Sequence, residues 1–86
     1  MAGRLLPDTN AFIALMRGDA SAVRAFDDAT EVVLSAVVLG ELTYGALNSR
    51  SPEANLANVQ RLREQCRFAP VDEIVVRRYG ARFGWL

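Results

Sequence analysis

Short apolar runs occur at three places along the chain and indicate strands. They are RLLP at residues 4–7, EVVLS at 31–35 and RFAPV at 67–71. The middle run carries β-branched side chains, and its length suits a strand that is buried on both faces. The hydrophobic pattern therefore predicts three short strands that are widely separated along the chain.

Elsewhere, apolar residues recur at helical spacing and are preceded by residues that typically begin helices. Asp8 or Thr9, Asp19, Ser35 and Asp72 are placed to cap helices, and a further helix opens with Ser-Pro-Glu at residue 51. The five predicted helices span residues 9–18 (with Gly18 past the end), 19–29, 36–49, 51–66 and 73–86.

The predicted order of elements is β-α-α-β-α-α-β-α. Strands that alternate with helices favour a parallel sheet covered by helices on both faces, which is a three-layer α/β fold. A chain of 86 residues has room for one small domain but not for two. We therefore expect a single α/β domain over residues 1–86.

Composition indicates the cellular compartment of such a domain. Apolar residues make up 51% of the chain, but no uninterrupted apolar segment is long enough to span a membrane. The single cysteine, Cys66, excludes an internal disulfide and a cysteine-based zinc cluster, and the N-terminus lacks the pattern of a secretory signal. We expect a cytoplasmic protein that has no membrane partner.

The chain contains no histidine, and all ten of its basic residues are arginine. This composition excludes Ser-His-Asp and Cys-His catalysis, most zinc sites and lysine Schiff-base chemistry. Ten acidic residues balance the arginines, so a nucleic acid would have to meet a local basic patch. Arg4, Arg17 and Arg50 are the candidates for such a patch, and a solvated arginine surface is the alternative.

Two carboxylates stand in apolar sequence. Asp8 follows the first predicted strand, at the end of a parallel sheet where ligands bind, although a helix cap explains the residue equally well. Glu41 has Val38 and Tyr44 among its neighbours one helical turn away, which predicts a carboxylate on or beside the inward face. The alternative is a glutamate at the edge of the apolar stripe whose carboxylate reaches solvent.

If the first two strands are neighbours in a parallel sheet, Asp8 and Glu41 reach the same crevice. Two carboxylates without histidine or cysteine form a site of oxygen ligands only, which suits Mg²⁺ or Mn²⁺. Such an ion can activate water and stabilise the charge that develops when a phosphodiester is displaced. Asp8 and Glu41 are therefore the candidate metal ligands and catalytic residues.

The segments LLPDTNAFIAL (residues 5–15) and LSAVVLGELTYGAL (residues 34–47) together resemble the PIN domain, in particular the VapC-type toxins of bacterial toxin–antitoxin pairs. The resemblance implies a three-layer α/β fold and a Mg²⁺-dependent endoribonuclease, usually a homodimer, that a cognate antitoxin holds inactive. It matches Asp8 and Glu41 to the metal-binding acids. It also matches Thr9, Asn10 and Ser35 to polar positions that line or support the site.

The resemblance covers the N-terminal two-thirds of a PIN domain. The family also uses acidic residues from a later segment, and no Asp or Glu follows Glu73 here. Asp72 and Glu73 fall where a helix cap is expected, so we do not expect them to replace those acids. The chain is thus expected to be a truncated, partial PIN domain whose first strand forms an open edge. Dimerisation, an antitoxin or a swapped element would then stabilise it.

The sequence leaves open whether this partial domain cleaves RNA. One alternative is a catalytically inactive remnant that binds an antitoxin or self-associates. Two groups of residues are candidates for such a surface, with ordinary core packing as the simpler explanation: Leu56, Val59, Arg61, Leu62 and Arg63, or Ala22, Val23 and Phe26. A ligand-binding α/β domain unrelated to nucleases is the third hypothesis, but the chain lacks a glycine-rich phosphate loop.

Overall fold

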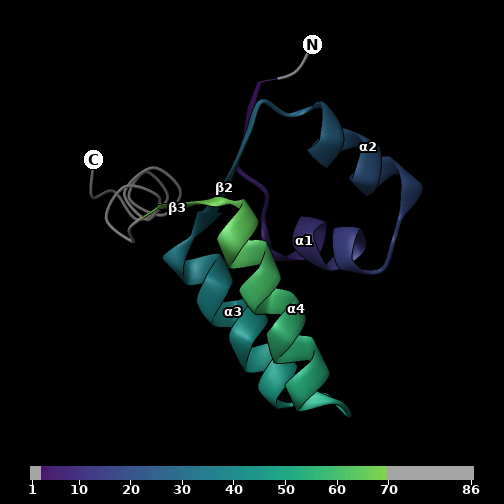
Figure 1. Ribbon diagram of the computed structural model, residues 1–86, viewed down its shortest axis with the longest axis vertical. Helices are drawn as coiled ribbons and strands as arrows, with labels where there is room; N and C mark the ends of the chain where they lie inside the picture. The colour runs from purple at the N-terminus through teal and green to yellow at the C-terminus, as the bar shows by residue number, and fades with distance from the viewer. Residues whose placement is uncertain (1–2, 70–86) are drawn as a thin grey trace, which may run out of the picture.

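The computed structural model describes residues 3–69, which form three strands and four helices (Figure 1). In chain order the elements are β1 (Arg4–Leu5), α1 (Thr9–Met16), α2 (Ala20–Asp28), β2 (Glu31–Ser35), α3 (Ala36–Leu47), α4 (Pro52–Gln65) and β3 (Arg67–Ala69). This is the predicted order as far as β3. The predicted strand residues 70–71, the cap at Asp72 and the helix over 73–86 lie outside the described residues. Among the four described helices, none has the length and apolar character needed to cross a membrane.

The three strands form a parallel sheet with β2 in the middle. Arg4 of β1 pairs with Glu31 of β2, and Leu34 of β2 pairs with Phe68 of β3. β1 is shorter than predicted and ends before Pro7, which has no amide hydrogen to donate to a ladder. Because the strands are parallel, the segments that lead into α1 and α3 leave the sheet at the same end. The described residues therefore have the predicted α/β fold.

Three helices begin with the predicted capping residues. The side chain of Asp8 accepts a hydrogen bond from the backbone N–H of Ala11 at 2.9 Å, and Asp19 caps α2 in the same way at 3.0 Å. Ser35 accepts from the N–H of Val38 at 3.1 Å. Each bond satisfies one of the amide groups that a first helical turn leaves without a partner. Local sequence thus fixes where α1, α2 and α3 begin.

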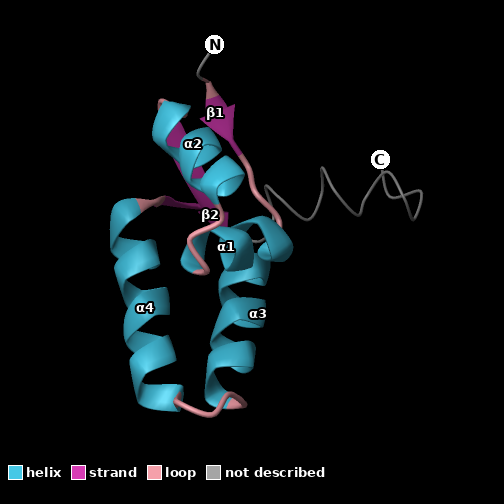
Figure 2. Ribbon diagram, turned by 90° about the vertical axis from the view of Figure 1, so that its right-hand side faces the viewer, coloured by secondary structure: helices cyan, strands magenta, loops and turns pink. Residues whose placement is uncertain are grey.

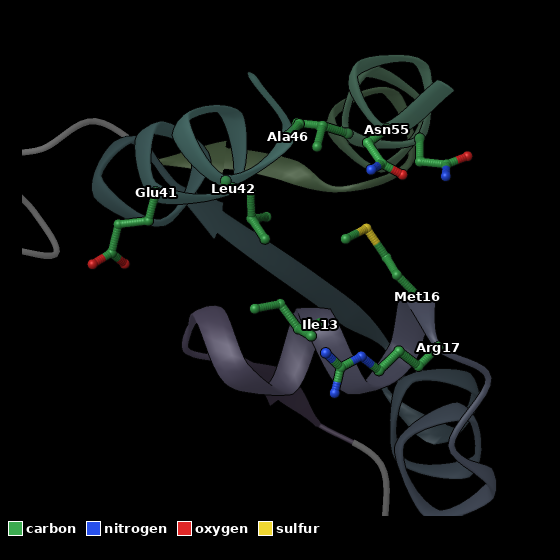
Figure 3. Close-up of a pocket in the computed structure, with 10 residues that line it drawn as sticks. Ile13, Met16, Arg17, Glu41, Leu42, Ala46 and Asn55 are labelled. Atoms are coloured by element: carbon green, nitrogen blue, oxygen red, sulfur yellow. The ribbon is translucent and has the colours of Figure 1, made fainter. Parts of the chain in front are cut away.

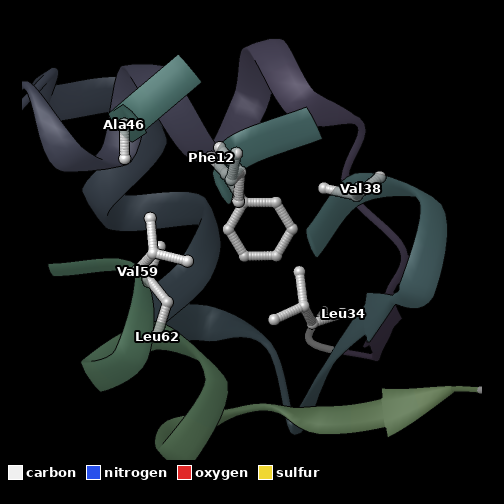
Figure 4. Packing of buried hydrophobic residues seen from close by; sticks show 7 residues of the cluster. Phe12, Leu34, Val38, Ala46, Val59 and Leu62 are labelled. Atoms are coloured by element: carbon white, nitrogen blue, oxygen red, sulfur yellow. The ribbon is translucent and has the colours of Figure 1, made fainter. Parts of the chain in front are cut away.

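One main apolar cluster joins β2 to α1, α3 and α4 (Figure 4). Phe12 of α1 is completely buried at its centre, and its ring meets the edge of Phe26 of α2 with ring centres 5.3 Å apart. The buried members are Phe12, Leu34, Val38, Leu42, Ala46, Val59 and Leu62. Val59 and Leu62, two of the candidates for a partner surface on α4, are buried here. They pack in the core, as the simpler explanation had it.

Helices α3 and α4 lie side by side and project away from the strands (Figure 2). Their connection is held by Ser49, whose hydroxyl donates to the carbonyl of Ala46 at 2.6 Å and accepts from the Asn55 amide at 2.7 Å. Because the hairpin projects, one side of α3 has no cover from the described residues, and Tyr44 is 71% exposed there. This arrangement decides which side chains of α3 reach solvent.

Candidate active site

The two sequence motifs meet through Thr9 and Glu41. The Thr9 hydroxyl, in the first turn of α1, donates a hydrogen bond to Oε1 of Glu41 on α3. Thr9 directly follows Asp8, so the contact joins the DTN segment to the glutamate across 32 positions of the chain. The parallel sheet makes this contact because α1 and α3 start from the same end of neighbouring strands.

Asp8 caps α1 with one carboxylate oxygen and keeps the other available. Oδ1 accepts the Ala11 N–H, whereas Oδ2 has no hydrogen-bond partner among residues 3–69. The side chain is exposed although Pro7 before it and Phe12 after it are buried, so its charge carries no large desolvation cost. A carboxylate has about four lone-pair sites. The capping role and a ligand role are therefore compatible at Asp8.

Of the two positions predicted for the Glu41 carboxylate, on or beside the inward face of its helix, the structure shows the one beside it. The buried stripe of α3 consists of Val38, Leu42 and Ala46, and Glu41 lies just beside it, exposed. The apolar residue Tyr44, which suggested an inward position, is itself exposed. Glu41 is thus the glutamate at the edge of the stripe that the alternative described, with its carboxylate in reach of both solvent and Thr9.

The two other predicted polar residues differ in their surroundings. Ser35 is buried at the end of β2, and its hydroxyl oxygen accepts a hydrogen bond from the Val38 N–H, so Ser35 caps the N-terminus of α3. Asn10 is exposed on α1, and its side chain makes no hydrogen bond to any described residue. The structure thus brings Thr9 and Glu41 together beside Asp8, while Ser35 and Asn10 stay outside that contact.

The oxygen atoms of Asp8, Thr9 and Glu41 are of the kind that a hard divalent cation prefers. Asp8 Oδ2 and the Glu41 carboxylate are acidic, and the Thr9 hydroxyl adds a neutral oxygen. Mg²⁺ often binds through one or two carboxylates and keeps several waters, so this small set is sufficient in number. No cluster of three or more Asp, Glu, His or Cys side chains able to hold a metal occurs within residues 3–69.

A cleft of about 360 Å³ opens beside Glu41, between α1, α3 and α4 (Figure 3). Ile13, Met16 and Leu42 point toward the space between the helices, and Glu41 lies at its edge. Its full lining is Ile13, Met16, Arg17, Glu41, Leu42, Gly45, Ala46, Asn55, Asn58 and Val59. Asn55 and Asn58 were not among the residues predicted from the sequence, where their only signal is a spacing of three residues on one helix face.

Only one of the three candidate arginines shares this cleft with Glu41. Arg17 caps the C-terminal end of α1 and lines the cleft. Arg4 instead pairs with Glu31 at 3.2 Å where β1 and β2 begin, at the opposite end of the sheet from Asp8. Arg50 follows α3 at the far tip of the α3–α4 hairpin. The basic patch expected from these three residues is therefore reduced to Arg17.

Comparisons with known proteins bear on the fold. A family model described as the PIN domain matches residues 5–83. A solved structure described as DNA-bound VapBC from Salmonella typhimurium matches with a TM-score of 0.71 and 22% sequence identity, over 99% of this chain and 67% of that chain. At this identity the likeness concerns the fold. The curated proteins contain no match to the chain.

Proposed function

This chain belongs to the PIN domain family, and from that premise we propose that it is a metal-dependent endoribonuclease, the toxin of a type II toxin–antitoxin pair. The observation that carries the proposal is the Thr9–Glu41 hydrogen bond beside Asp8. It links the two motif segments at the end of the sheet where α/β domains bind ligands. RNA is the proposed substrate, and the protein would act in the cytoplasm.

The proposed cofactor is Mg²⁺ or Mn²⁺, held by Asp8 Oδ2 and the Glu41 carboxylate. A bound ion of this kind activates water and neutralises the charge of a displaced phosphodiester. Asp8 supplies its oxygen from a fixed position because its other oxygen is tied to the first turn of α1. Thr9, the residue after Asp8, restrains the Glu41 carboxylate by donating its hydroxyl hydrogen to Oε1. Asp8 and Glu41 thus act as ligands, and Thr9 acts as a positioning residue.

Matched substitutions test this assignment. Asp8→Asn and Glu41→Gln should each abolish Mg²⁺-dependent cleavage of a fluorescent single-stranded RNA and weaken Mn²⁺ binding measured by calorimetry. Asp19→Asn is the control for Asp8, because Asp19 caps α2 through the same contact and asparagine caps a helix as well as aspartate does. Glu53→Gln is the control for Glu41, because Glu53 is exposed on α4. Cleavage that persists in Asp8→Asn would refute the proposed ligand set.

The second candidate function is an inactive PIN domain that binds an antitoxin or a second copy of itself. It is favoured by the two-carboxylate site and by the large apolar side chains of Tyr44 and Leu47, which are exposed one turn apart on α3. Absence of RNA cleavage at every Mg²⁺ and Mn²⁺ concentration, with antitoxin binding intact, would select this function. In either case an antitoxin is the proposed protein partner, and a homodimer is the proposed assembly.

A further inference from the structure

The cleft beside Glu41 combines apolar walls with two amide side chains. Ile13, Met16 and Leu42 supply apolar surface from α1 and α3, and the half-buried Asn55 and Asn58 come from α4. Its volume of about 360 Å³ lies at the lower end of the range for pockets that bind small molecules. Apolar walls with a few convergent polar groups are typical of sites that bind small molecules.

Each amide in the cleft has one hydrogen-bonding atom still available. Asn55 donates through Nδ2 to Ser49, while its Oδ1 accepts from no described residue. Asn58 accepts through Oδ1 from Arg61, while its Nδ2 donates to no residue in the 3–69 range. The two residues lie three positions apart and so share one face of α4. The cleft therefore offers one acceptor and one donor at neighbouring positions.

Arg17 adds a positive charge to the same cleft. Within residues 3–69 its guanidinium group makes no ion pair or hydrogen bond through its side chain. Arg4 and Arg67 instead pair with Glu31, and Arg61 donates to Asn58. An unpaired guanidinium at the cleft favours a ligand that also carries an anionic group.

From these observations we infer that the cleft is a subsite for one unstacked base of single-stranded RNA, adjacent to the scissile phosphate. The inference rests on the proposed function. The Asn55 oxygen and the Asn58 amide bind the edge of the base, the apolar walls contact its faces, and Arg17 binds a flanking phosphate. Proteins read single-stranded RNA in this manner, through splayed bases whose edges are hydrogen-bonded. The subsite gives the enzyme a base preference next to the cut.

A nucleotide fits this combination better than an apolar peptide does. A peptide side chain that fills the apolar part would leave Arg17 and both free amide atoms without partners, and half-buried polar groups without partners are unfavourable. A nucleotide supplies an edge with donors and acceptors together with a phosphate. Glu41 also lines the cleft, so a strand bound at the proposed metal ligands has a neighbouring nucleotide within reach of it.

The test uses the full chain carrying Asp8→Asn, which prevents cleavage, and four short single-stranded RNAs that differ in one base. We expect the side-chain amide signals of Asn55 and Asn58 to shift on binding, with one base favoured. Asn58→Ala should weaken binding of that RNA about tenfold, the effect of losing about one hydrogen bond, and reduce the preference among bases. Asn48→Ala is the matched control, because Asn48 is exposed at the end of α3 and bonds only to the Tyr44 carbonyl.

The outcomes separate the subsite from the nuclease. RNA that binds without shifting either amide, or an acidic apolar peptide that shifts both while RNA does not, overturns the subsite. If the wild-type chain cleaves RNA and Asn58→Ala changes neither rate nor base preference, the subsite is refuted and the proposed function stands. Base-selective binding in the cleft, together with a wild-type chain that cleaves no RNA, supports the base-binding site and refutes the nuclease.

Discussion

The substitution Thr9→Val removes the hydroxyl that joins the two motif segments and leaves the shape of the side chain almost unchanged. Thr9 is half-buried, and its hydroxyl donates to a charged acceptor, which makes the hydrogen bond stronger than one between neutral groups. Glu41 is exposed, however, so water replaces the lost donor and no buried charge is left without a partner. We therefore expect a small change in folding stability, on the order of 0.5 kcal/mol.

The effect on ion binding should be larger than the effect on folding. Without the Thr9 hydroxyl, the Glu41 side chain samples several rotamers, and only some of them place its oxygens toward Asp8. Restoring the productive rotamer costs about 1 kcal/mol of side-chain entropy, which corresponds to about fivefold weaker Mn²⁺ binding. The concentration of Mg²⁺ needed for half-maximal cleavage should rise by a similar factor, while the rate at saturating Mg²⁺ changes less.

Calorimetric Mn²⁺ titrations and Mg²⁺-dependent cleavage measure these effects. Thr43→Val is the matched control, because the Thr43 hydroxyl lies on the same helix as Glu41 and donates to the Leu39 carbonyl at 2.8 Å. Thr9→Ser should restore binding, since it returns the hydroxyl. Equal effects of Thr9→Val and Thr43→Val, or unchanged ion binding in Thr9→Val, would show that Thr9 does not position Glu41.

Three further predictions concern the fold that holds the site. Phe12→Ala should lower the free energy of unfolding by about 3–5 kcal/mol in urea titrations, because it empties the centre of the main core; a loss below about 1 kcal/mol would contradict this packing. Gly18→Ala should destabilise the chain by about 1 kcal/mol despite the open space around Gly18, because its φ of 79° is unfavourable for alanine. Identical melting temperatures of the wild-type chain and Gly18→Ala would contradict this backbone conformation. Burial raises the pKa of the Cys66 thiol, so Cys66 ionises at lower pH in the unfolded chain than in the folded one, and the free energy of unfolding should fall in alkaline solution. If a Cys66→Ser variant loses the same stability at high pH, Cys66 is not the cause.

The features that sequence predicted best depend on contacts within a few residues. Asp8, Asp19 and Ser35 each bond to an amide three positions further on, so the local pattern suffices to locate them. The parallel sheet followed from the alternation of apolar runs with helices, because few topologies satisfy that order. The contact between Thr9 and Glu41 is a consequence of that topology.

The features that sequence missed depend on how α3 and α4 pack together. Apolar neighbours predict a Glu41 carboxylate on or beside the inward face of α3, but the hairpin leaves one side of α3 open, and both Glu41 and Tyr44 are exposed. Asn55 and Asn58 line the cleft only because α4 packs along α3 and faces α1, an arrangement that no local pattern encodes. Residue spacing thus gives the faces of a helix, and tertiary packing decides which face is covered.

If Asp8 is a ligand of the proposed ion, its position explains why a second carboxylate is needed. Asp8 stands at the N-terminus of α1, where the partial positive charge of the helix stabilises its carboxylate and repels a cation. Its capping bond to Ala11 also occupies one of its two oxygens. Asp8 alone is therefore a poor cation ligand, fixed in place but weakly attractive. Glu41 comes from the middle of α3, away from that helix's own N-terminus, and so brings a full negative charge without the same opposing field. The hydrogen bond from Thr9 to Glu41 would then link the fixed carboxylate of Asp8 to the more strongly attractive carboxylate of Glu41.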